Sequence, residues 1–126
     1  VLKKVHDHLA PGGRFLFTAP HPAFPFLDRS AEPPFFFDTE GLDYFSARDH
    51  QLEGRIWRRD GESVPVRCVH KPMDEYFSAL EHAGFEGAPR VTELSVTPEH
   101  LALDREFFGP LRGLPLHVAF EVSRDS

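Results

Sequence analysis

A single histidine stands between two prolines, as Pro20-His21-Pro22, directly after a short apolar run at residues 14–19. An imidazole titrates near neutral pH, so it can take a proton or hold a polar group by hydrogen bond. The apolar run is typical of a buried strand, and ligands of open α/β sheets bind just beyond the carboxyl ends of the strands. We therefore expect His21 either to contact a substrate and take its proton or only to brace its loop by a hydrogen bond.

Aromatic residues crowd the segment from residue 22 to residue 70. Pockets lined by aromatic side chains select small organic ligands, so these side chains are candidates to line one. The residues expected to line such a pocket are Phe24, Phe26, Tyr44, Trp57 and His70, together with Phe35, Phe36, Phe37 and Phe45. The alternative for each ring is plain packing of this segment on the core, which burial statistics favour.

Other motifs that carry chemistry are missing from the sequence. It has no GxGxxG loop, no Walker loop, no GxSxG and no HExxH. His6 and His8 are two residues apart on an expected helix and point to different faces, so we expect no metal site. Cys68 stands alone in a strand-like run, which indicates a packed side chain rather than a nucleophile.

The chain has 126 residues and a net charge of −6, and its basic residues form no run. A nucleic-acid partner needs clustered positive charge, so we expect none. No apolar stretch could span a bilayer, and a lone cysteine fits a reducing compartment, so we expect a cytoplasmic protein without a membrane partner. Val1-Leu2-Lys3-Lys4-Val5 is typical of mid-helix, which indicates a chain that starts partway through a longer protein.

Hydrophobic periodicity predicts the elements of the N-terminal half. Residues 1–9 have helical spacing and end at Pro11-Gly12-Gly13. The almost continuous apolar character of residues 14–19 predicts a strand buried on both faces in a parallel sheet. Residues 22–46 are rich in proline, so we expect a long loop or cap there rather than the interior of a sheet.

The C-terminal half contains the clearest helix pattern. We predict a helix with Asp74 as its N-cap and Gly84 directly after its end. Its apolar stripe, which includes Tyr76, Phe77 and Leu80, is assigned to the core. Strands are predicted at residues 91–94 and 116–122, with a loop and a short helix between them.

A β-hairpin is predicted around Asp60-Gly61, which lies between two strand-like runs. With a two-residue loop, Trp57 would lie opposite Val64. Because side chains alternate along a strand, one face would then carry Trp57, Val64, Val66, Cys68 and His70.

Three segments, taken in order, resemble class I S-adenosylmethionine-dependent methyltransferases. Residues 1–17, with Leu9-Ala10-Pro11-Gly12-Gly13, resemble the helix and turn that lead into the fifth strand of that family. Pro20-His21-Pro22 resembles the His-Pro step of one bacterial subgroup. Residues 70–85 are similar to the His-Arg-Pro helix of that subgroup, which ends in Ala-Gly-Phe, and here Lys71 stands where Arg is usual.

The resemblance implies an α/β fold, namely the C-terminal half of a Rossmann-like sheet with a parallel strand, a helix, an antiparallel final hairpin and an inserted β-hairpin cap. Residues 1–21 would supply the helix end and core strand, residues 22–70 the Phe-rich substrate cap, and residues 71–126 the helix and last two strands. The cofactor would be S-adenosylmethionine. The parts that hold it in the family would lie upstream, so no residue of this chain is assigned to it.

The resemblance also implies methyl transfer to a small-molecule acceptor. Such a transfer needs an aligned acceptor and often a base, and His21 is the candidate for that base. We expect the chain alone to be an inactive fragment. Two alternatives remain open: a stand-alone α+β binding module for an apolar ligand or partner, and a gene remnant without activity.

Overall fold

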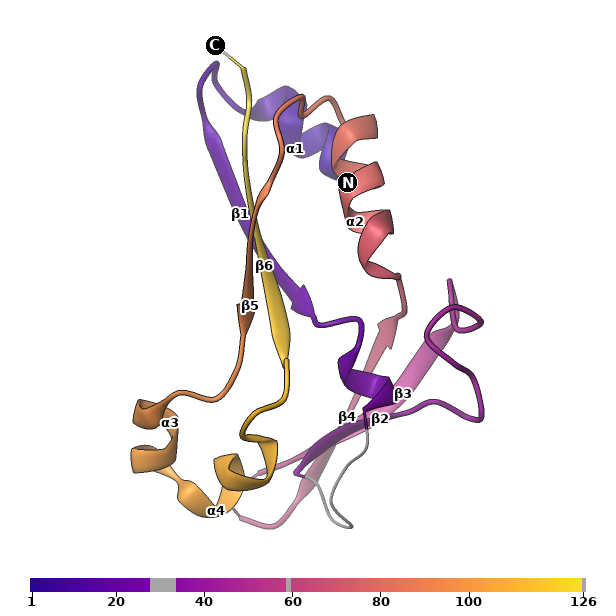
Figure 1. Cartoon of the computed structure of the whole chain (residues 1–126), viewed down its shortest axis with the longest axis vertical. Coiled ribbons are helices and arrows are strands. Elements are labelled where there is room, and N and C mark those ends of the chain that lie inside the picture. Colours follow the sequence, from indigo (N-terminus) through magenta and orange to yellow (C-terminus); the bar gives the residue numbers. More distant parts are fainter. Residues whose placement is uncertain (28–33, 59, 126) are drawn as a thin grey trace.

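The structure is a computed structural model and describes residues 1–27, 34–58 and 60–125. Residues 28–33, which belong to the expected cap, lie outside the described residues. The elements are, in chain order, α1 (Leu2–His8), β1 (Arg14–Pro20), η1 (Phe24–Phe26), β2 (Phe35–Asp38), β3 (Gln51–Trp57), β4 (Ser63–Val69), α2 (Met73–His82), β5 (Arg90–Leu94), α3 (Pro98–Leu103), α4 (Arg105–Phe108), η2 (Gly109–Leu111) and β6 (His117–Ser123). They form two three-stranded sheets, with α1 and α2 beside the first and α3 and α4 at the opposite end of the molecule (Figure 1).

The first sheet has the order β1-β6-β5, and the central strand β6 is antiparallel to both neighbours. The strands predicted near residues 91–94 and 116–122 are confirmed, as is their antiparallel pairing. Because β1 and β5 are both antiparallel to β6, they run in the same direction. Their carboxyl ends therefore lie at the same end of the sheet.

The prediction that β1 is buried on both faces in a parallel sheet is wrong for the described residues. Its partner β6 is antiparallel, and exposed and partly buried residues alternate along it. Leu16 is 64% exposed. The reason is that β1 lies at the edge of the sheet, and α1 and α2 cover one face only, so every second side chain meets solvent.

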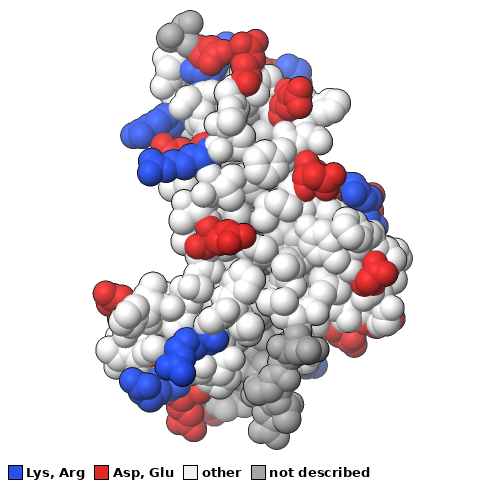
Figure 2. All heavy atoms as spheres, in the orientation of Figure 1, with Lys and Arg blue, Asp and Glu red and all other residues white. Residues whose placement is uncertain are grey.

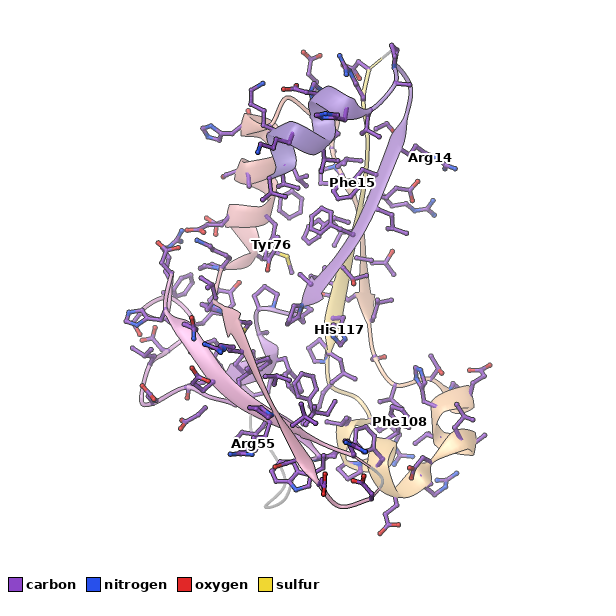
Figure 3. All side chains as sticks on the ribbon, turned by 180° about the vertical axis from the view of Figure 1, so that it is seen from behind. Arg14, Phe15, Arg55, Tyr76, Phe108 and His117 are labelled. Carbon is purple, nitrogen blue, oxygen red and sulfur yellow. The ribbon has the colours of Figure 1, made fainter. Side chains whose placement is uncertain are left out.

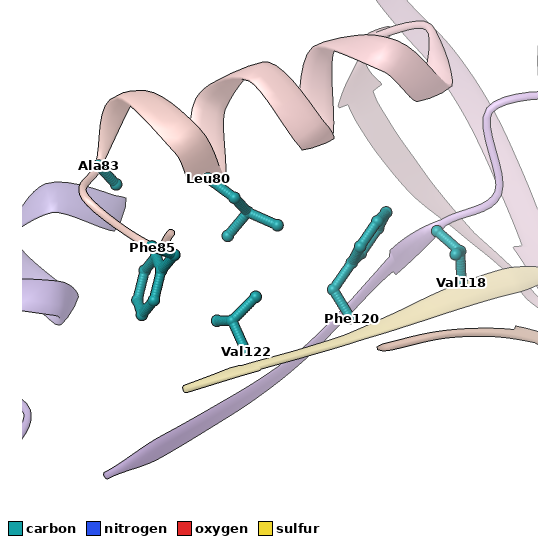
Figure 4. Packing of buried hydrophobic residues seen from close by; sticks show 6 residues of the cluster. All are labelled: Leu80, Ala83, Phe85, Val118, Phe120 and Val122. Carbon is teal, nitrogen blue, oxygen red and sulfur yellow. The ribbon is translucent and has the colours of Figure 1, made fainter. Parts of the chain in front are cut away.

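The core between α2 and the first sheet consists of side chains that the helix and β6 supply together (Figure 4). Val118, Phe120 and Val122 alternate along β6 and all point toward α2, as the period of two requires. Leu80 of α2 packs against them and is 2% exposed. Full burial of such a side chain contributes roughly 2 kcal/mol, so this layer fixes α2 on the sheet.

Helix α2 begins two residues earlier than the sequence predicts. Its N-cap is Pro72, not Asp74, which lies in the first turn. Proline fits there because its fixed φ suits the entry to a helix. The expected C-terminal glycine is confirmed: Gly84 has φ 109°, and the Phe85 N–H donates to the Leu80 carbonyl at 3.2 Å.

The second sheet has the order β2-β3-β4, with all pairs antiparallel. Strand β2 lies in the segment expected to be a long loop or cap rather than the interior of a sheet, and the structure adds an edge strand there over Phe35–Asp38. The strand is four residues long and at the edge of its sheet, where the nearby prolines cost no ladder bond. A three-residue Phe run, apolar and aromatic, suits such a strand.

The predicted register of the hairpin is wrong by one residue. Trp57 lies opposite Ser63, and Ile56 lies opposite Val64, so the connection spans residues 58–62. A shift of one residue moves a side chain to the other face of the sheet. Trp57 therefore does not share a face with Val66 and Cys68.

The inner face of the second sheet packs on η1, η2 and α4 as a separate core. Its buried members are Phe24, Phe37, Leu52 and Leu111. Helix α3 starts with Thr97 as N-cap in a capping box with His100. Contacts between neighbouring residues therefore stabilise the start of the segment that joins β5 to β6. At the other end of the molecule, the Arg124 guanidinium donates to the Leu9 carbonyl at 2.7 Å and holds the end of α1.

Acidic and basic side chains are interspersed on the face of the molecule that Figure 2 shows. Within the described ranges, no helix combines the length and the apolar character that a membrane crossing requires.

Candidate functional site

His21 follows β1 directly, at the carboxyl end of that strand, and is 7% exposed. Its Nδ1 accepts a hydrogen bond from the Ala23 N–H at 3.1 Å. An imidazole that accepts at Nδ1 carries its proton on Nε2, so Nε2 donates to Glu93 Oε1 at 3.0 Å. Both ring nitrogens are engaged by the protein, which fits the bracing role better than the role of a base.

His70 follows β4 directly and is 3% exposed. Its Nε2 lies 2.8 Å from the Tyr44 carbonyl oxygen, which can only accept, so Nε2 carries the proton. Nδ1 then holds a lone pair. Among the described residues, no hydrogen-bond donor reaches this nitrogen.

Tyr44 connects the cap to α2. Its hydroxyl accepts from the Met73 N–H at 2.8 Å, which satisfies one of the free donors in the first turn of the helix. Its ring lies 5.4 Å from that of His70 and 6.2 Å from that of Phe26. The rings of Phe26 and His70 are 5.0 Å apart, so the three form one edge-to-face cluster.

A small cavity brings His21 and His70 together. Its volume is about 20 Å³, which holds roughly one water molecule. Its walls come from the end of β1, the end of β4 and the start of α2, and are formed by Pro20, His21, Pro22, Pro25, Cys68, Val69, His70, Lys71 and Tyr76. The described residues thus place two histidines around a space for one small polar group, not for a whole substrate.

Burial raises the pKa of two further residues that line this cavity, Cys68 and Tyr76. It is the main cause for the Tyr76 hydroxyl, whose pKa Cys68 also raises. At neutral pH neither is an anion, so neither is an activated nucleophile. Figure 3 shows Tyr76 between α2 and the strands of the first sheet.

Lys71, which lines the cavity, belongs to a group of charged pairs. Lys71 pairs with Asp49 and Glu75, and Arg48 pairs with Glu75. The Asp49 carboxylate is the main cause that raises the pKa of Lys71, and Lys71 lowers that of Asp49. These side chains join the cap to α2, although exposed pairs of this kind contribute little to stability.

Five of the expected pocket residues lie elsewhere, namely Phe24, Trp57 and the β2 residues Phe35, Phe36 and Phe37. Phe24 is fully buried in the core of the second sheet, with its ring 5.2 Å from that of Phe35. Trp57 stacks on Phe36, with ring centroids 5.9 Å apart, on the outer face of that sheet. Figure 3 shows Arg55 on this same outer side. Phe26, Tyr44 and His70 are brought together, whereas Phe24 and Trp57 are not.

Sequence reasoning missed two residues of the site. Glu93 was only part of a predicted strand, yet its carboxylate accepts from His21 across 72 positions of sequence. Tyr76 was assigned to the core, and it does stack on Phe120 at 5.2 Å, but it also lines the cavity. For Tyr76, the sequence did offer a signal: it places a polar hydroxyl within an otherwise apolar helix stripe. No sequence signal pointed to Glu93.

No group of three or more metal-ligating side chains occurs in the part of the chain that the structure describes. S-adenosylmethionine is far larger than the cavity at His21, and no Gly-rich loop follows a described strand. The described residues therefore do not fit that cofactor by themselves.

No family model matches the sequence, and no curated protein matches it. A solved structure from Listeria monocytogenes, named as an S-adenosylmethionine-dependent methyltransferase, has 22% identity and a TM-score of 0.60, over 99% of this chain and 54% of that one. The CcbJ methyltransferase from Streptomyces caelestis has 15% identity and a TM-score of 0.48, over 99% and 49%. The chain spans about half the length of the solved structures it matches. The likeness to the Listeria structure shows the fold: a mixed α/β arrangement with two antiparallel sheets that matches part of a methyltransferase-like structure.

Proposed function

We propose that this chain is the C-terminal, acceptor-side part of an S-adenosylmethionine-dependent methyltransferase that acts on a small molecule. The observation that carries the proposal is the first sheet, in which β6 runs antiparallel between two strands of common direction, together with the match to about half of the Listeria structure. The methyltransferase resemblance of residues 1–17 and 70–85 supports the same family.

The free edge of β1 supports the idea that further strands complete the sheet. Among the described strands β1 pairs only with β6, and Leu16 exposes an apolar side chain beside that edge. In this proposal the missing strands pair with β1 and bring the cofactor, which supplies the methyl group. Alone, the 126-residue chain would then be inactive.

Within the proposed enzyme, the two histidines have different parts. His70 lines the cavity, and the lone pair of its Nδ1 would accept a hydrogen bond from a hydroxyl or amino group of the acceptor. His21, held by Ala23 and Glu93, would position the loop after β1. Phe26 and Tyr44 would support His70, with Tyr44 fixing its tautomer. The cap residues Phe24 and Trp57 would act through packing.

The first test is to express the complete reading frame to which this chain belongs. We expect that protein to bind S-adenosylmethionine by calorimetry and to transfer a radiolabelled methyl group to members of a panel of phenols, amines and carboxylic acids. We expect residues 1–126 alone to do neither. A complete frame that fails to bind the cofactor would overturn the proposal and favour a binding module.

The role of His70 has its own pair of variants. His70→Gln keeps a donor where Nε2 reaches the Tyr44 carbonyl but removes the acceptor at Nδ1, whereas His70→Asn does the reverse. In the complete protein we expect His70→Gln to lose about tenfold or more in kcat/KM, with its melting temperature near that of the wild type. His70→Asn should be less stable than His70→Gln. Each folded molecule of His70→Asn should nevertheless keep more of the wild-type kcat/KM.

A further inference from the structure

Most polar groups in the wall of the small cavity at His21 and His70 already have partners within the protein. Both ring nitrogens of His21 are hydrogen-bonded. The ammonium group of Lys71, the charged residue of this wall, pairs with the carboxylates of Asp49 and Glu75. A ligand that used either side chain would first have to displace a contact of the protein itself.

Two strong hydrogen-bonding groups of the wall remain, namely Nδ1 of His70 and the hydroxyl of Tyr76. Neither forms a hydrogen bond with another described residue. No fully buried nitrogen or oxygen atom of the described side chains lacks a partner, so both of these atoms keep some accessible surface. The thiol of Cys68 also lines the cavity, but burial raises its pKa, and a neutral thiol is only a weak donor.

Packing holds the ring of Tyr76 in place. It stacks on the buried ring of Phe120 with centroids 5.2 Å apart, between α2 and the first sheet (Figure 3). Burial is the main cause that raises the pKa of Tyr76, Cys68 raises it further, and Lys71 lowers it. Charges act most strongly at short range, so the hydroxyl of Tyr76 lies near these two residues of the cavity wall.

The two groups together favour one kind of ligand. The Tyr76 hydroxyl can donate a hydrogen bond, and Nδ1 of neutral His70 can only accept one. A hydroxyl group satisfies both, because its single oxygen accepts one bond and donates another. A carboxylate has no proton to give to Nδ1. An aliphatic ammonium has no lone pair for the proton of Tyr76, and its charge would lose its hydration in the cavity.

The size and the backbone of the cavity fit the same group. Its volume of about 20 Å³ holds roughly one water molecule, and a hydroxyl group is no larger. Pro20, Pro22 and Pro25 form part of the wall and have no backbone N–H to donate. The hydrogen bonds to a bound oxygen must therefore come largely from side chains.

We propose that this cavity binds one hydroxyl group of the small molecule on which the proposed methyltransferase acts. Tyr76 donates to the oxygen of that group, and Nδ1 of His70 accepts the hydrogen bond from its proton. The inference rests on the proposed function and narrows its substrate class to alcohols and phenols. Tyr76 becomes a residue that determines specificity.

The test uses the complete protein and four probes that share one aromatic ring, namely phenol, toluene, benzoate and benzylamine. Calorimetric titration without S-adenosylmethionine measures their affinities. Phenol should bind about tenfold or more tightly than each of the other three, because a site that hydrogen-bonds a hydroxyl discriminates against analogues that lack it.

Tyr76→Phe removes the hydroxyl and keeps the ring that stacks on Phe120. It should weaken the binding of phenol by about tenfold, leave the binding of toluene unchanged and keep the melting temperature near that of the wild type. His70→Gln should weaken the binding of phenol by a similar factor. Ser78→Ala removes an exposed hydroxyl from the same helix and should change neither affinity.

Equal affinities for phenol and toluene would overturn the inference, as would phenol binding that Tyr76→Phe leaves unchanged. An equal loss of phenol and toluene binding in Tyr76→Phe would also overturn it, since the residue would then act through structure alone. A complete protein with any of these results that still binds S-adenosylmethionine and transfers its methyl group would leave the proposed function standing. A protein that does not bind S-adenosylmethionine would instead overturn the proposed function.

Discussion

The two buried histidines show how the same side chain acquires different chemistry from its hydrogen bonds. Ala23 occupies Nδ1 of His21, and Glu93 occupies its Nε2. At His70 the Tyr44 carbonyl fixes the proton on Nε2 and leaves Nδ1 with its lone pair. Which nitrogen can serve a ligand therefore depends on backbone groups that a sequence pattern does not reveal.

His21→Ala should lower the free energy of unfolding by about 1–3 kcal/mol, because it removes a buried side chain and leaves the Ala23 N–H without its acceptor. Urea unfolding followed by circular dichroism would measure the change. Glu93→Gln keeps an acceptor for Nε2 and should change the same quantity by less than about 1 kcal/mol. A His21→Ala chain as stable as the wild type would contradict the bracing role.

His117 should make folding sensitive to pH. Burial lowers its pKa from the ordinary value of 6.5, so the unfolded chain binds a proton more readily than the folded one. Stability is therefore present above pH 6.5 and is lost as the pH falls below that value. Unfolding curves at several pH values should show the wild type losing stability relative to His117→Asn as the pH is lowered. Parallel curves would contradict the burial of this imidazole.

At the scale of elements, the hairpin shows how a small error in the predicted loop length places side chains on the wrong face of the sheet. Asp60-Gly61 correctly marks the turn, yet the connection spans five residues, and Trp57 pairs with Ser63. Gly54 lies opposite Phe37, and a side chain on Gly54 would overlap the Phe36 carbonyl oxygen.

Gly54→Ala should destabilise the second sheet by about 3 kcal/mol, because the added Cβ would push β2 away from β3. Thermal unfolding of the purified variant measures the effect. Gly109→Ala is the matched control: a Cβ there meets no atom within 4 Å, and its change should stay within about 0.5 kcal/mol. Equal melting temperatures for Gly54→Ala and the wild type would show that β2 does not approach β3 this closely.

At the scale of the whole molecule, two cores share one chain. One lies between α2 and the first sheet, and the other lies between the second sheet and the short helices at the opposite end (Figure 1). Helix α2 belongs to the first core, while its N-terminal turn is held by Tyr44 of the cap. The cavity with His21 and His70 lies where these two parts meet.

The open edge of β1 should make the chain associate with itself. Leu16 is 64% exposed beside that edge, and an apolar edge strand is a template for pairing with another chain. Leu16→Lys should reduce concentration-dependent association in sedimentation velocity, because a charge on an edge strand opposes such pairing. Leu103→Lys changes an exposed leucine on α3 and should have no such effect. A wild-type chain that stays monomeric at all concentrations would contradict this expectation.

Local sequence by itself determined α1, β1, the body and C-terminal end of α2, and β6. Each of these depends on residues a few positions apart: the apolar stripe of α2, Gly84 after it, or the alternation from Val118 to Val122. Phe26, Tyr44 and His70 were expected among the residues of one pocket, and their role in binding a substrate stays a prediction. The contact between their three rings was not predicted.

Only the tertiary structure decided which strands pair, in which register, and which ring nitrogens remain available. The β1–β6 pairing joins residues 97 to 109 positions apart, and Glu93 reaches His21 from another strand. Such contacts arise from the packing of whole elements, and a one-residue shift in any strand would replace all of them. For that reason the same local pattern was compatible with Trp57 inside the cap pocket and with Trp57 on the outer face, and only the assembled sheet selects between the two.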